Sequence, residues 1–522
     1  MDEIKKFLAN TQTAMHWKEV GICPHHGICM PLFSLHSKKS SGIGEFFDLY
    51  LLIDWCCSVG MDVLQLLPLN ECHFHDPSPY NALSSCALDY IYISLHDLPY
   101  VQEDQELQAL LKGFDKYKAY QYVDYMRLRK SKLTFLKLYC KKYFPRFEKL
   151  TEFHAFIRLN SWIEEYAAYK ILKELNDRKP WQEWTINTKP NELFHHHKDE
   201  LHFNTLIQYL AYSQMMKVKE YATKKGVLLK GDVPLSLSPD SADVYFHREI
   251  FDVNYVIGVP PDDICPFGDK WGFYLFNWKA LKESNFAWWK RRLALVSNLY
   301  HMYRIDHAVG FFRLWAIPPL EDSSHGQFIP KDPSKWEALG RENFKMFISS
   351  SPLLPLAEDL GLIPPFVYTV LKDLGICGTK VMRWQKKDPK QFNPITMTTV
   401  STHDTETLSQ WWQRSDSEAS RFAALWGLPY EPNFTNDLRK QLLIQAHCSR
   451  SLFHINLLPE YLAFFEELIH ADPDDERINI AGTTSPSNWS YRLVHPLEEV
   501  TSHSGLKKVI KEILKPPKNH NF

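Results

Sequence analysis

The stretch 301–315, HMYRIDHAVGFFRLW, sets Arg304, Asp306 and His307 among apolar and aromatic residues. Charged side chains are rarely buried unless they are paired or used for chemistry. Arg304 and Asp306 are two residues apart, so on a strand they lie on the same side. An arginine there favours the ionised form of the carboxylate and holds its pKa down, as a carboxylate nucleophile requires.

Other carboxylates also follow apolar runs. Asp232 follows VLLKG, Glu358 and Asp359 follow SPLLPLA, and Asp404 follows TTVSTH. A single carboxylate at a strand end usually caps the next helix. A succession of such positions, some beside a histidine or an arginine, is harder to assign to capping. In an α/β barrel these strand ends meet at one face, where active sites lie.

Several carboxylates without metal ligands favour the cleavage or transfer of glycosides. In a retaining mechanism one carboxylate attacks the anomeric carbon and a carboxylic acid, about 5–5.5 Å away, protonates the leaving oxygen. That acid needs a raised pKa, which a less polar setting or a neighbouring carboxylate provides. The stretch LLPLAEDLG around Glu358 offers both.

The elements that would carry these residues alternate between short apolar runs and longer helical stretches. The runs 61–70, 226–237 and 395–408 predict buried strands that leave into polar loops, and Gly226 is a typical helix stop. This alternation predicts βα units and a parallel sheet. Between about 99 and 205, apolar residues at three- and four-residue spacings predict an inserted set of amphipathic helices.

Composition narrows the class of protein further. The 522 residues are 45% hydrophobic and 23% charged, which is ordinary for a globular chain. The net charge of −2 gives no electrostatic case for binding nucleic acid or an anionic membrane. The basic run RLRKSKL (127–133) is expected to form a solvated helix face. No apolar run approaches the roughly 18 residues of a membrane span, and the N-terminus lacks a signal-peptide core.

Cysteine and histidine usage predicts no metal site. The ten cysteines include no CxxC pair, so neither a zinc site nor a disulfide framework is expected, and reduced thiols predict a cytoplasmic protein. The stretch HHHKDEL (195–201) matches no standard spacing of metal ligands and is expected to be a polar helix start or a loop.

Motifs along the chain resemble a known family. RIDH (304–307), AEDLG (357–361), GDVP (231–234) and THD (402–404) resemble the four signature regions of the α-amylase clan. Further motifs resemble the 4-α-glucanotransferase (amylomaltase) family, in order along the chain: GIGEF (42–46), QLLPL (65–69), SPY (78–80), DSADVY (240–245), GVPPDD (258–263) and NWSYR (488–492). MPLFSLHS, WGFYLFNW and FAWWKRRL, together with the helical insertion, are most similar to the plant cytosolic disproportionating-enzyme branch.

The resemblance, which runs from about residue 25 to 500, implies an α/β fold, a (β/α)8 TIM barrel with a large α-helical insertion. Residues 20–98 and 206–510 would form the catalytic barrel, 99–205 the helical insertion and 511–522 a loose C-terminal tail. The plant enzymes also carry N-terminal starch-binding domains, whereas this chain begins almost directly at the barrel. Affinity for a large glucan is therefore expected to rest on the barrel and its insertion.

The same resemblance implies roles for individual residues. Asp306 would be the nucleophile, Glu358 the general acid and base, and Asp404 the carboxylate that orients sugar hydroxyls and stabilises the transition state. His307 would hold its loop. The positions that contact or support the sugars would be Tyr80, Asp232, Trp271, Arg304 and His403. In GDKWG (268–272), Asp269 stands where the family usually has a substrate-contacting glutamine.

The implied activity is retaining transfer of glucosyl or maltosyl units between α-1,4-glucans, without a cofactor. Maltose or maltooligosaccharides would be donors, and glucose, oligosaccharides or glycogen acceptors. A hydrolase on the same fold is the near alternative, because only the acceptor differs. A non-catalytic glucan-binding protein is a further alternative, which the intact set of three carboxylates disfavours. The oligomeric state stays open.

Overall fold

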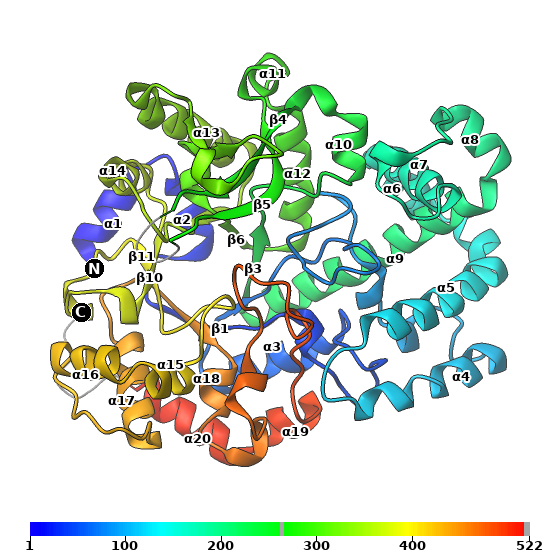
Figure 1. Ribbon diagram of the computed structural model, residues 1–522. Coiled ribbons are helices and arrows are strands. Elements are labelled where there is room, and N and C mark those ends of the chain that lie inside the picture. The colour runs from blue at the N-terminus through cyan, green and yellow to red at the C-terminus, as the bar shows by residue number, and fades with distance from the viewer. Residues whose placement is uncertain (262–265, 516–522) are drawn as a thin grey trace.

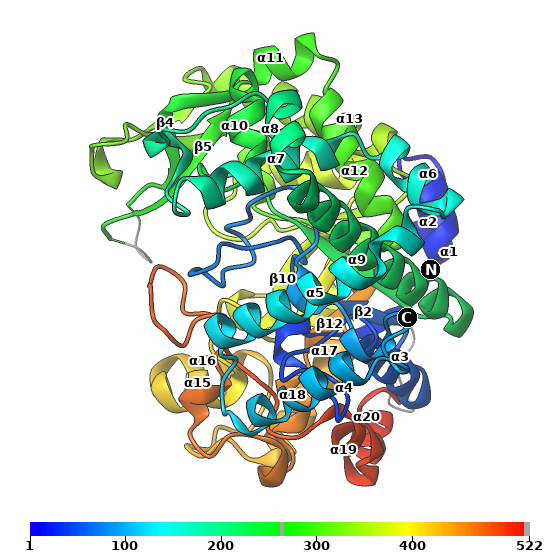
Figure 2. The same cartoon turned by 90° about the vertical axis from the view of Figure 1, so that its right-hand side faces the viewer.

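The computed structural model describes residues 1–261 and 266–515, and Figures 1 and 2 show it from two directions. At its centre is a parallel eight-stranded sheet in the order β10-β11-β12-β1-β2-β3-β6-β9. A parallel bridge between Leu356 of β9 and Cys377, directly before β10, joins the two edges of this sheet. The sheet is therefore a nearly closed barrel, and the predicted α/β barrel fold is confirmed.

The barrel strands are short and almost entirely buried, as expected for parallel strands that are covered on both faces. Their bounds are β1 (His25–Cys29), β2 (Val63–Gln65), β3 (Leu228–Val233), β6 (Met302–Ile305), β9 (Leu354–Ala357), β10 (Gly378–Val381), β11 (Thr396–Thr399) and β12 (Phe453–Leu457). The strands predicted within 61–70, 226–237 and 395–408 are β2, β3 and β11, so these three predictions are confirmed.

Helices surround the barrel (Figure 1). They are α1 (Asp2–Leu8), α2 (Ala14–Val20), α3 (Asp48–Val59), α12 (Ala287–Leu299), α13 (Trp336–Ser350), α14 (Pro365–Leu374), α15 (Leu408–Arg414), α16 (Asp416–Leu425), α17 (Asn436–His447), α18 (Pro459–Leu462), α19 (Leu497–Ser502) and α20 (Ser504–Ile513). The connection from β10 to β11 contains only 3₁₀ turns, so the βα alternation is interrupted there. The tail predicted for 511–522 begins inside α20, and residues 516–522 lie outside the described part of the chain.

The connection from β2 to β3 carries a large set of helices on one side of the barrel (Figure 2). They are α4 (Gln105–Lys112), α5 (Tyr125–Phe147), α6 (Thr151–Leu159), α7 (Trp162–Leu175), α8 (Pro190–His196) and α9 (Lys198–Lys225). The long helix α9 packs against α3, α5 and α7 and leads into β3. The boundary predicted at residue 205 falls inside α9, and the division into segments stays a prediction. Gly226, at φ +70°, ends this helix as predicted.

The basic run 127–133 on α5 is not a purely solvated face, and this prediction is wrong for two of its residues. Arg129 and Lys132, three residues apart on the helix, are buried. Arg129 lies 2.7 Å from Asp89, and Lys132 lies 2.6 Å from Glu45. A helix with a 3.6-residue period turns one part of a charge run inward, where barrel loops supply the partner carboxylates.

A second sheet, which the sequence did not predict, stands beside the barrel (Figure 1). Its antiparallel strands have the order β5-β4-β7-β8. Their bounds are β4 (Phe251–Val259), β5 (Asp269–Phe276), β7 (Leu314–Ile317) and β8 (Gln327–Ile329), and the short helices α10 (Ala242–Phe246) and α11 (Trp278–Glu283) flank β4 and β5 in the chain. Residues 262–263 of the GVPPDD motif lie outside the described residues.

Candidate active site

Arg304 on β6 gathers three of the predicted carboxylates. Its Nη1 donates to both oxygens of Asp232, at 2.8 and 2.7 Å. Its Nη2 lies 3.0 Å from Oδ1 of Asp306 and 2.8 Å from Oε2 of Glu358. The strand register explains this convergence, because β3 places Asp232 beside Arg304, while Asp306 and Glu358 directly follow the neighbouring strands β6 and β9.

The shared nitrogen limits how far apart Asp306 and Glu358 can be. Two oxygens that lie 3.0 and 2.8 Å from one atom are separated by no more than about 5.8 Å, which fits the roughly 5–5.5 Å of a retaining pair better than the roughly 6.5–9.5 Å of an inverting pair. The geometry therefore favours direct attack by one carboxylate over activation of a water between the two.

His307 shapes the turn between these two carboxylates. Its backbone has φ +42°, in the left-handed region that a non-glycine residue adopts at a cost of about 1–3 kcal/mol. In this conformation its N–H donates to Oε2 of Glu358 at 2.8 Å. Its ring packs edge-on against Trp271 of β5, with centroids 4.8 Å apart. His307 thus joins the carboxylate cluster to the second sheet, and its role in holding the loop stays a prediction.

Tyr80 and His403 extend the cluster on another side. The Tyr80 hydroxyl donates to Oδ2 of Asp232 at 2.9 Å and lies 2.9 Å from Nε2 of His403. The Tyr80 and His403 rings are stacked, with centroids 5.6 Å apart. Nε2 of His403 lies 3.2 Å from Asp404, which belongs to the loop after β11. The structure therefore brings all eight predicted site residues into one connected set, with Trp271 linked through His307.

Three further residues belong to this set and were not predicted as site residues. Asn479 donates to Oδ1 of Asp404 at 2.7 Å, and Arg477 donates to the Asp404 backbone carbonyl at 3.3 Å. The Trp489 ring lies 5.5 Å from that of Tyr80. The NWSYR motif could have pointed to Trp489. No pattern indicates Asn479, because its partner is 75 residues away in the chain.

The pKa of Asp306 shifts upward, whereas the sequence predicted a downward shift. Burial raises the pKa of Asp306 to about 8, and Glu358 and Asp232 add to this rise, whereas Arg304 opposes it. The guanidinium of Arg304 does not prevail because it is divided among three carboxylates. Arg304 thus lowers the pKa of Asp306 as predicted, but burial and the two neighbouring carboxylates outweigh it in the unliganded protein.

The pKa of Glu358 shifts in the opposite direction, below its ordinary value. Burial favours its protonated form, but Arg304 and the His307 N–H outweigh burial and lower the pKa of Glu358. Carboxylates that interact this strongly titrate as a pair. The pair therefore shares a proton between Asp306 and Glu358, as a retaining mechanism needs.

Asp404 is an ionised carboxylate. Burial opposes its charge, but His403 and Asn479 hold the pKa of Asp404 well below its usual range. Burial also opposes the charge of His403, yet Asp404 raises the pKa of His403 above its ordinary value. The two residues therefore favour each other's charged forms beside the Asp306–Glu358 pair.

A cavity of about 460 Å³ opens next to the cluster. Two aromatic side chains of β5, Trp271 and Phe273, line it together with polar residues that include Asn81, Gln182 and Asp240. Flat rings beside hydrogen-bonding groups suit the alternating apolar and hydroxyl surfaces of a sugar. Asp269 begins the same strand, and its carboxylate accepts a hydrogen bond from the Lys270 N–H at 2.8 Å.

The described part of the chain contains no group of three or more His, Cys, Asp or Glu side chains that could hold a metal ion. The HHHKDEL stretch spans the end of α8 and the start of α9, as a polar helix start. Within 1–261 and 266–515, no helix combines the length and the apolar character needed to cross a membrane.

A nearly closed parallel barrel with closely spaced carboxylates at the ends of neighbouring strands is an arrangement suited to an enzyme that acts on glycosidic bonds. The family model described as 4-alpha-glucanotransferase matches residues 30–497. The chain therefore belongs to the 4-alpha-glucanotransferase family, and it is an enzyme of that class.

Individual relatives agree with this assignment. The chain is 38% identical to a Chlamydia pneumoniae 4-alpha-glucanotransferase over 98% of its own length and 99% of the relative's. A rice relative is 26% identical over 94% of this chain and 69% of its own length, so it is less similar than the chlamydial protein, contrary to the predicted closeness to the plant branch. The structure of an amylomaltase from Streptococcus agalactiae in complex with acarbose matches with a TM-score of 0.76 at 25% identity, covering 94% of this chain and 98% of that chain.

Proposed function

We propose that this enzyme transfers glucosyl or maltosyl units between α-1,4-glucans by a retaining double displacement. The observation that carries the proposal is the single guanidinium nitrogen shared by Asp306 and Glu358, at 3.0 and 2.8 Å. That spacing suits a nucleophile and an acid that act on the two sides of one glycosidic bond.

In the first step the Asp306 carboxylate attacks the anomeric carbon, and Glu358 gives its proton to the departing glycosidic oxygen. The bond to the leaving sugar breaks as the bond to Asp306 forms. In the second step Glu358 takes a proton from an acceptor hydroxyl, whose oxygen then displaces Asp306 from the anomeric carbon. Asp404, held in its ionised form by His403 and Asn479, stabilises the positive charge that develops on the sugar.

The first step requires the shared proton of the pair on Glu358. We infer that binding of the donor places it there. A glycosidic oxygen beside Glu358 accepts a hydrogen bond only from the protonated acid. The anomeric carbon, as it gains positive charge, stabilises the ionised form of Asp306. Both effects favour the catalytic distribution, and neither requires a change in the number of protons that the pair holds.

The remaining predicted residues would hold the sugars. Trp271 borders the 460 Å³ cavity and offers a ring against which a sugar face can stack. The Tyr80 hydroxyl would contact a sugar. Asp232, whose side chain is fully buried against Arg304, would support the site by accepting the Tyr80 hydrogen bond at 2.9 Å. Maltose and maltooligosaccharides are the proposed donors. Oligosaccharides, glucose or glycogen are the proposed acceptors.

Hydrolysis on the same site is the alternative, because water can replace the sugar hydroxyl in the second step. The deciding experiment uses maltose labelled in its non-reducing glucose, with and without glycogen. Transfer predicts one unlabelled glucose released per label incorporated into a longer glucan. Label on glycogen would indicate the plant-type reaction, and label only in oligosaccharides the amylomaltase type.

Release of two free glucoses per maltose, with no label in any longer product, would show hydrolysis and overturn the transfer proposal. Asp306→Asn is the control, since it keeps the shape of the side chain and removes the nucleophile. Binding of maltooligosaccharides by the wild-type protein without any turnover would instead support a non-catalytic glucan-binding protein.

A further inference from the structure

Arg292 is a buried arginine that the proposed mechanism does not use. It lies on α12, is 2% exposed, and its guanidinium is 5.5 and 5.1 Å from the ring centroids of Trp288 and Trp289. Among the described residues no carboxylate forms an ion pair with it. Its Nη1 donates instead to the backbone carbonyl of Pro234, at 2.9 Å. A buried cation without a paired carboxylate is costly, so its position calls for an explanation.

The Pro234 carbonyl belongs to the same peptide unit as the Leu235 N–H. That N–H donates to Oδ2 of Asp306 at 3.3 Å. A cation bound to a peptide carbonyl polarises the whole unit and strengthens its N–H as a donor. One peptide unit therefore connects the positive charge of Arg292 to the carboxylate of Asp306 by two successive hydrogen bonds.

The two oxygens of Asp306 are held from different directions. Oδ1 lies 3.0 Å from Nη2 of Arg304, and Oδ2 accepts the hydrogen bond from Leu235. Together these contacts fix the plane of the carboxylate, which an attack on the anomeric carbon requires. The Arg304 contact is shared with Glu358, whereas the peptide contact serves Asp306 alone.

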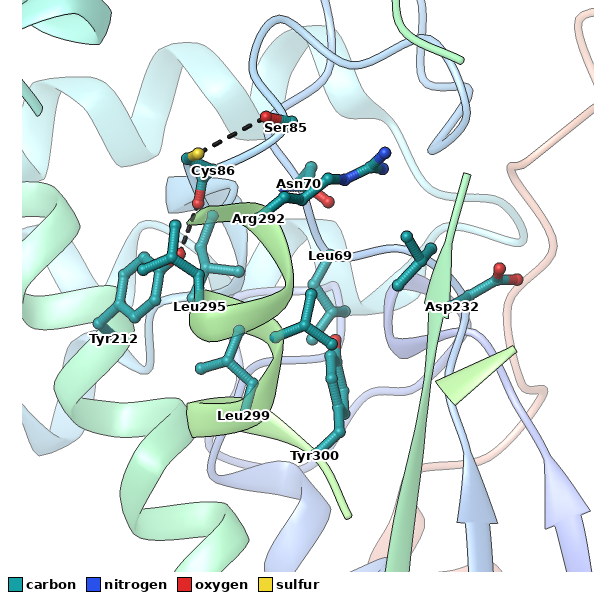
Figure 3. A pocket seen from close by; sticks show the side chains of 13 residues that line it. Leu69, Asn70, Ser85, Cys86, Tyr212, Asp232, Arg292, Leu295, Leu299 and Tyr300 are labelled. Atoms are coloured by element: carbon teal, nitrogen blue, oxygen red, sulfur yellow. Dashed lines mark hydrogen bonds between the residues drawn. The ribbon is translucent and has the colours of Figure 1, made fainter. Parts of the chain in front are cut away.

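Arg292 lies where no sugar can reach it. Beside it is a cavity of about 20 Å³, the size of a single water molecule. Figure 3 shows Arg292 beside Asn70 in this cavity, with Asp232 on the neighbouring strand. Tyr300 also lines the cavity, and a Cβ at Gly231 would meet its ring at 2.4 Å, so the glycine allows this close contact. Arg292 can therefore act on substrate only through other groups.

We propose that Arg292 is a positioning residue for the Asp306 nucleophile and acts through the Pro234–Leu235 peptide. The inference rests on the proposed role of Asp306. It adds a second cation to the site: Arg304 contacts Oδ1 of Asp306 directly, whereas Arg292 acts on Oδ2 through the peptide. The charged and titratable groups around Asp306 and Arg292 are Arg304, Asp232, Glu358, Asp243 and Cys86.

The test compares Arg292→Met and Arg292→Lys in the full chain. The methionine variant keeps much of the side-chain volume but loses the donor and the charge. We expect kcat to fall by about 10- to 100-fold, as for other residues that orient a reacting group, with KM within about twofold of the wild type. Lysine can donate to the Pro234 carbonyl and should recover part of the loss. Arg291→Met is the matched control, because Arg291 contacts Glu165 and His247 instead.

Two readouts separate positioning from a structural effect. α-Glucosyl fluoride is a donor whose leaving group needs no proton, so loss of Asp306 positioning slows its reaction as much as that of maltotriose. Removing a nearby positive charge also favours protonated Asp306, so the acid limb of the pH profile should move to higher pH in Arg292→Met. If the methionine variant does not fold, as checked by circular dichroism, Arg292→Gln, which also lacks the charge, replaces it in both readouts.

Unchanged kcat in both variants would overturn the inference. So would a loss confined to maltotriose, which would place the effect on Glu358, or a loss equal to that in Arg291→Met. Full activity of Asp306→Asn would refute the proposed function itself. That result is independent of Arg292, so the two failures can be told apart.

Discussion

Glu358→Gln is the change that best separates the two carboxylates. The Glu358 oxygen accepts from the His307 N–H at 2.8 Å and lies 2.8 Å from Nη2 of Arg304. A glutamine carbonyl can keep both contacts, so the substitution removes the acidic proton and the charge while preserving the shape of the site.

The expected loss follows from what a general acid supplies. Protonation of a leaving group contributes about 10²- to 10⁴-fold, or roughly 3–5.5 kcal/mol of the barrier. We expect kcat/KM for maltotriose to fall by that factor in Glu358→Gln. With α-glucosyl fluoride the first step needs no acid, so its rate should stay within about tenfold of the wild type.

A second effect of the same variant concerns pH. The negative charge of Glu358 helps to raise the pKa of Asp306 to about 8. The wild-type pair loses its shared proton as the pH rises, so the maltotriose reaction should slow at high pH. Glu358→Gln has no acidic proton to lose, and its residual maltotriose reaction should show no base limb.

The assay is the first-turnover burst of fluoride release, followed by rapid mixing at high enzyme concentration, beside glucose release from maltotriose measured from pH 5 to 9. Later turnovers are left out because their second step needs Glu358 as a base. Asp306→Asn should be inactive with both donors. Equal losses in the burst rate and in the maltotriose rate would refute the acid role of Glu358. A base limb that persists in Glu358→Gln would refute the shared proton of the two carboxylates.

Two further predictions concern stability. Lys132→Met leaves Glu45 buried without its partner at 2.6 Å, and should lower the free energy of unfolding by about 3–5 kcal/mol in urea titrations. Adding Glu45→Gln should recover part of this loss. The absence of any recovery would show that the loss comes from side-chain packing and not from the unpaired carboxylate. Burial disfavours the charge of His25, but Asp62 at 2.7 Å raises the pKa of His25 to about 10. The His25–Asp62 pair therefore contributes fully to the free energy of unfolding below about pH 6.5, and this contribution disappears as the pH rises towards 10. In Asp62→Asn the loss of stability across this window should be smaller, and an equal loss in both proteins would contradict the assignment.

The sequence predicted the parts of the fold that depend on local patterns. Apolar runs that end in polar residues identified β2, β3 and β11, and Gly226 marked the end of α9. Periodic apolar spacing predicted helices in the insertion. The second sheet was missed because β7 and β8 are short, and because β4 and β5 mix buried, half-buried and exposed residues. Such strands lack a continuous apolar run.

The candidate site divides in the same way. Asp306 and Glu358 could be named from the sequence because each directly follows a strand, and strand ends meet in a barrel. Asn479 could not be named, because its partner Asp404 comes close only when the loops around the barrel fold over one another. The inward turn of Arg129 and Lys132 also depends on carboxylates that lie far away in the chain.

The sequence by itself predicted a parallel α/β fold from short-range periodicity, and its motifs, through their resemblance to known enzymes, pointed to the family and to the residues that meet at the barrel mouth. The tertiary structure decided the direction in which the pKa of each carboxylate shifts. A pKa depends on burial and on every charge nearby, and Arg304 divides its guanidinium among Asp232, Asp306 and Glu358 in a way that no spacing along the chain reveals. The tertiary structure alone also linked Arg292 to Asp306. Helix α12 must pack against the end of β3 before the Pro234–Leu235 peptide can bond to both side chains.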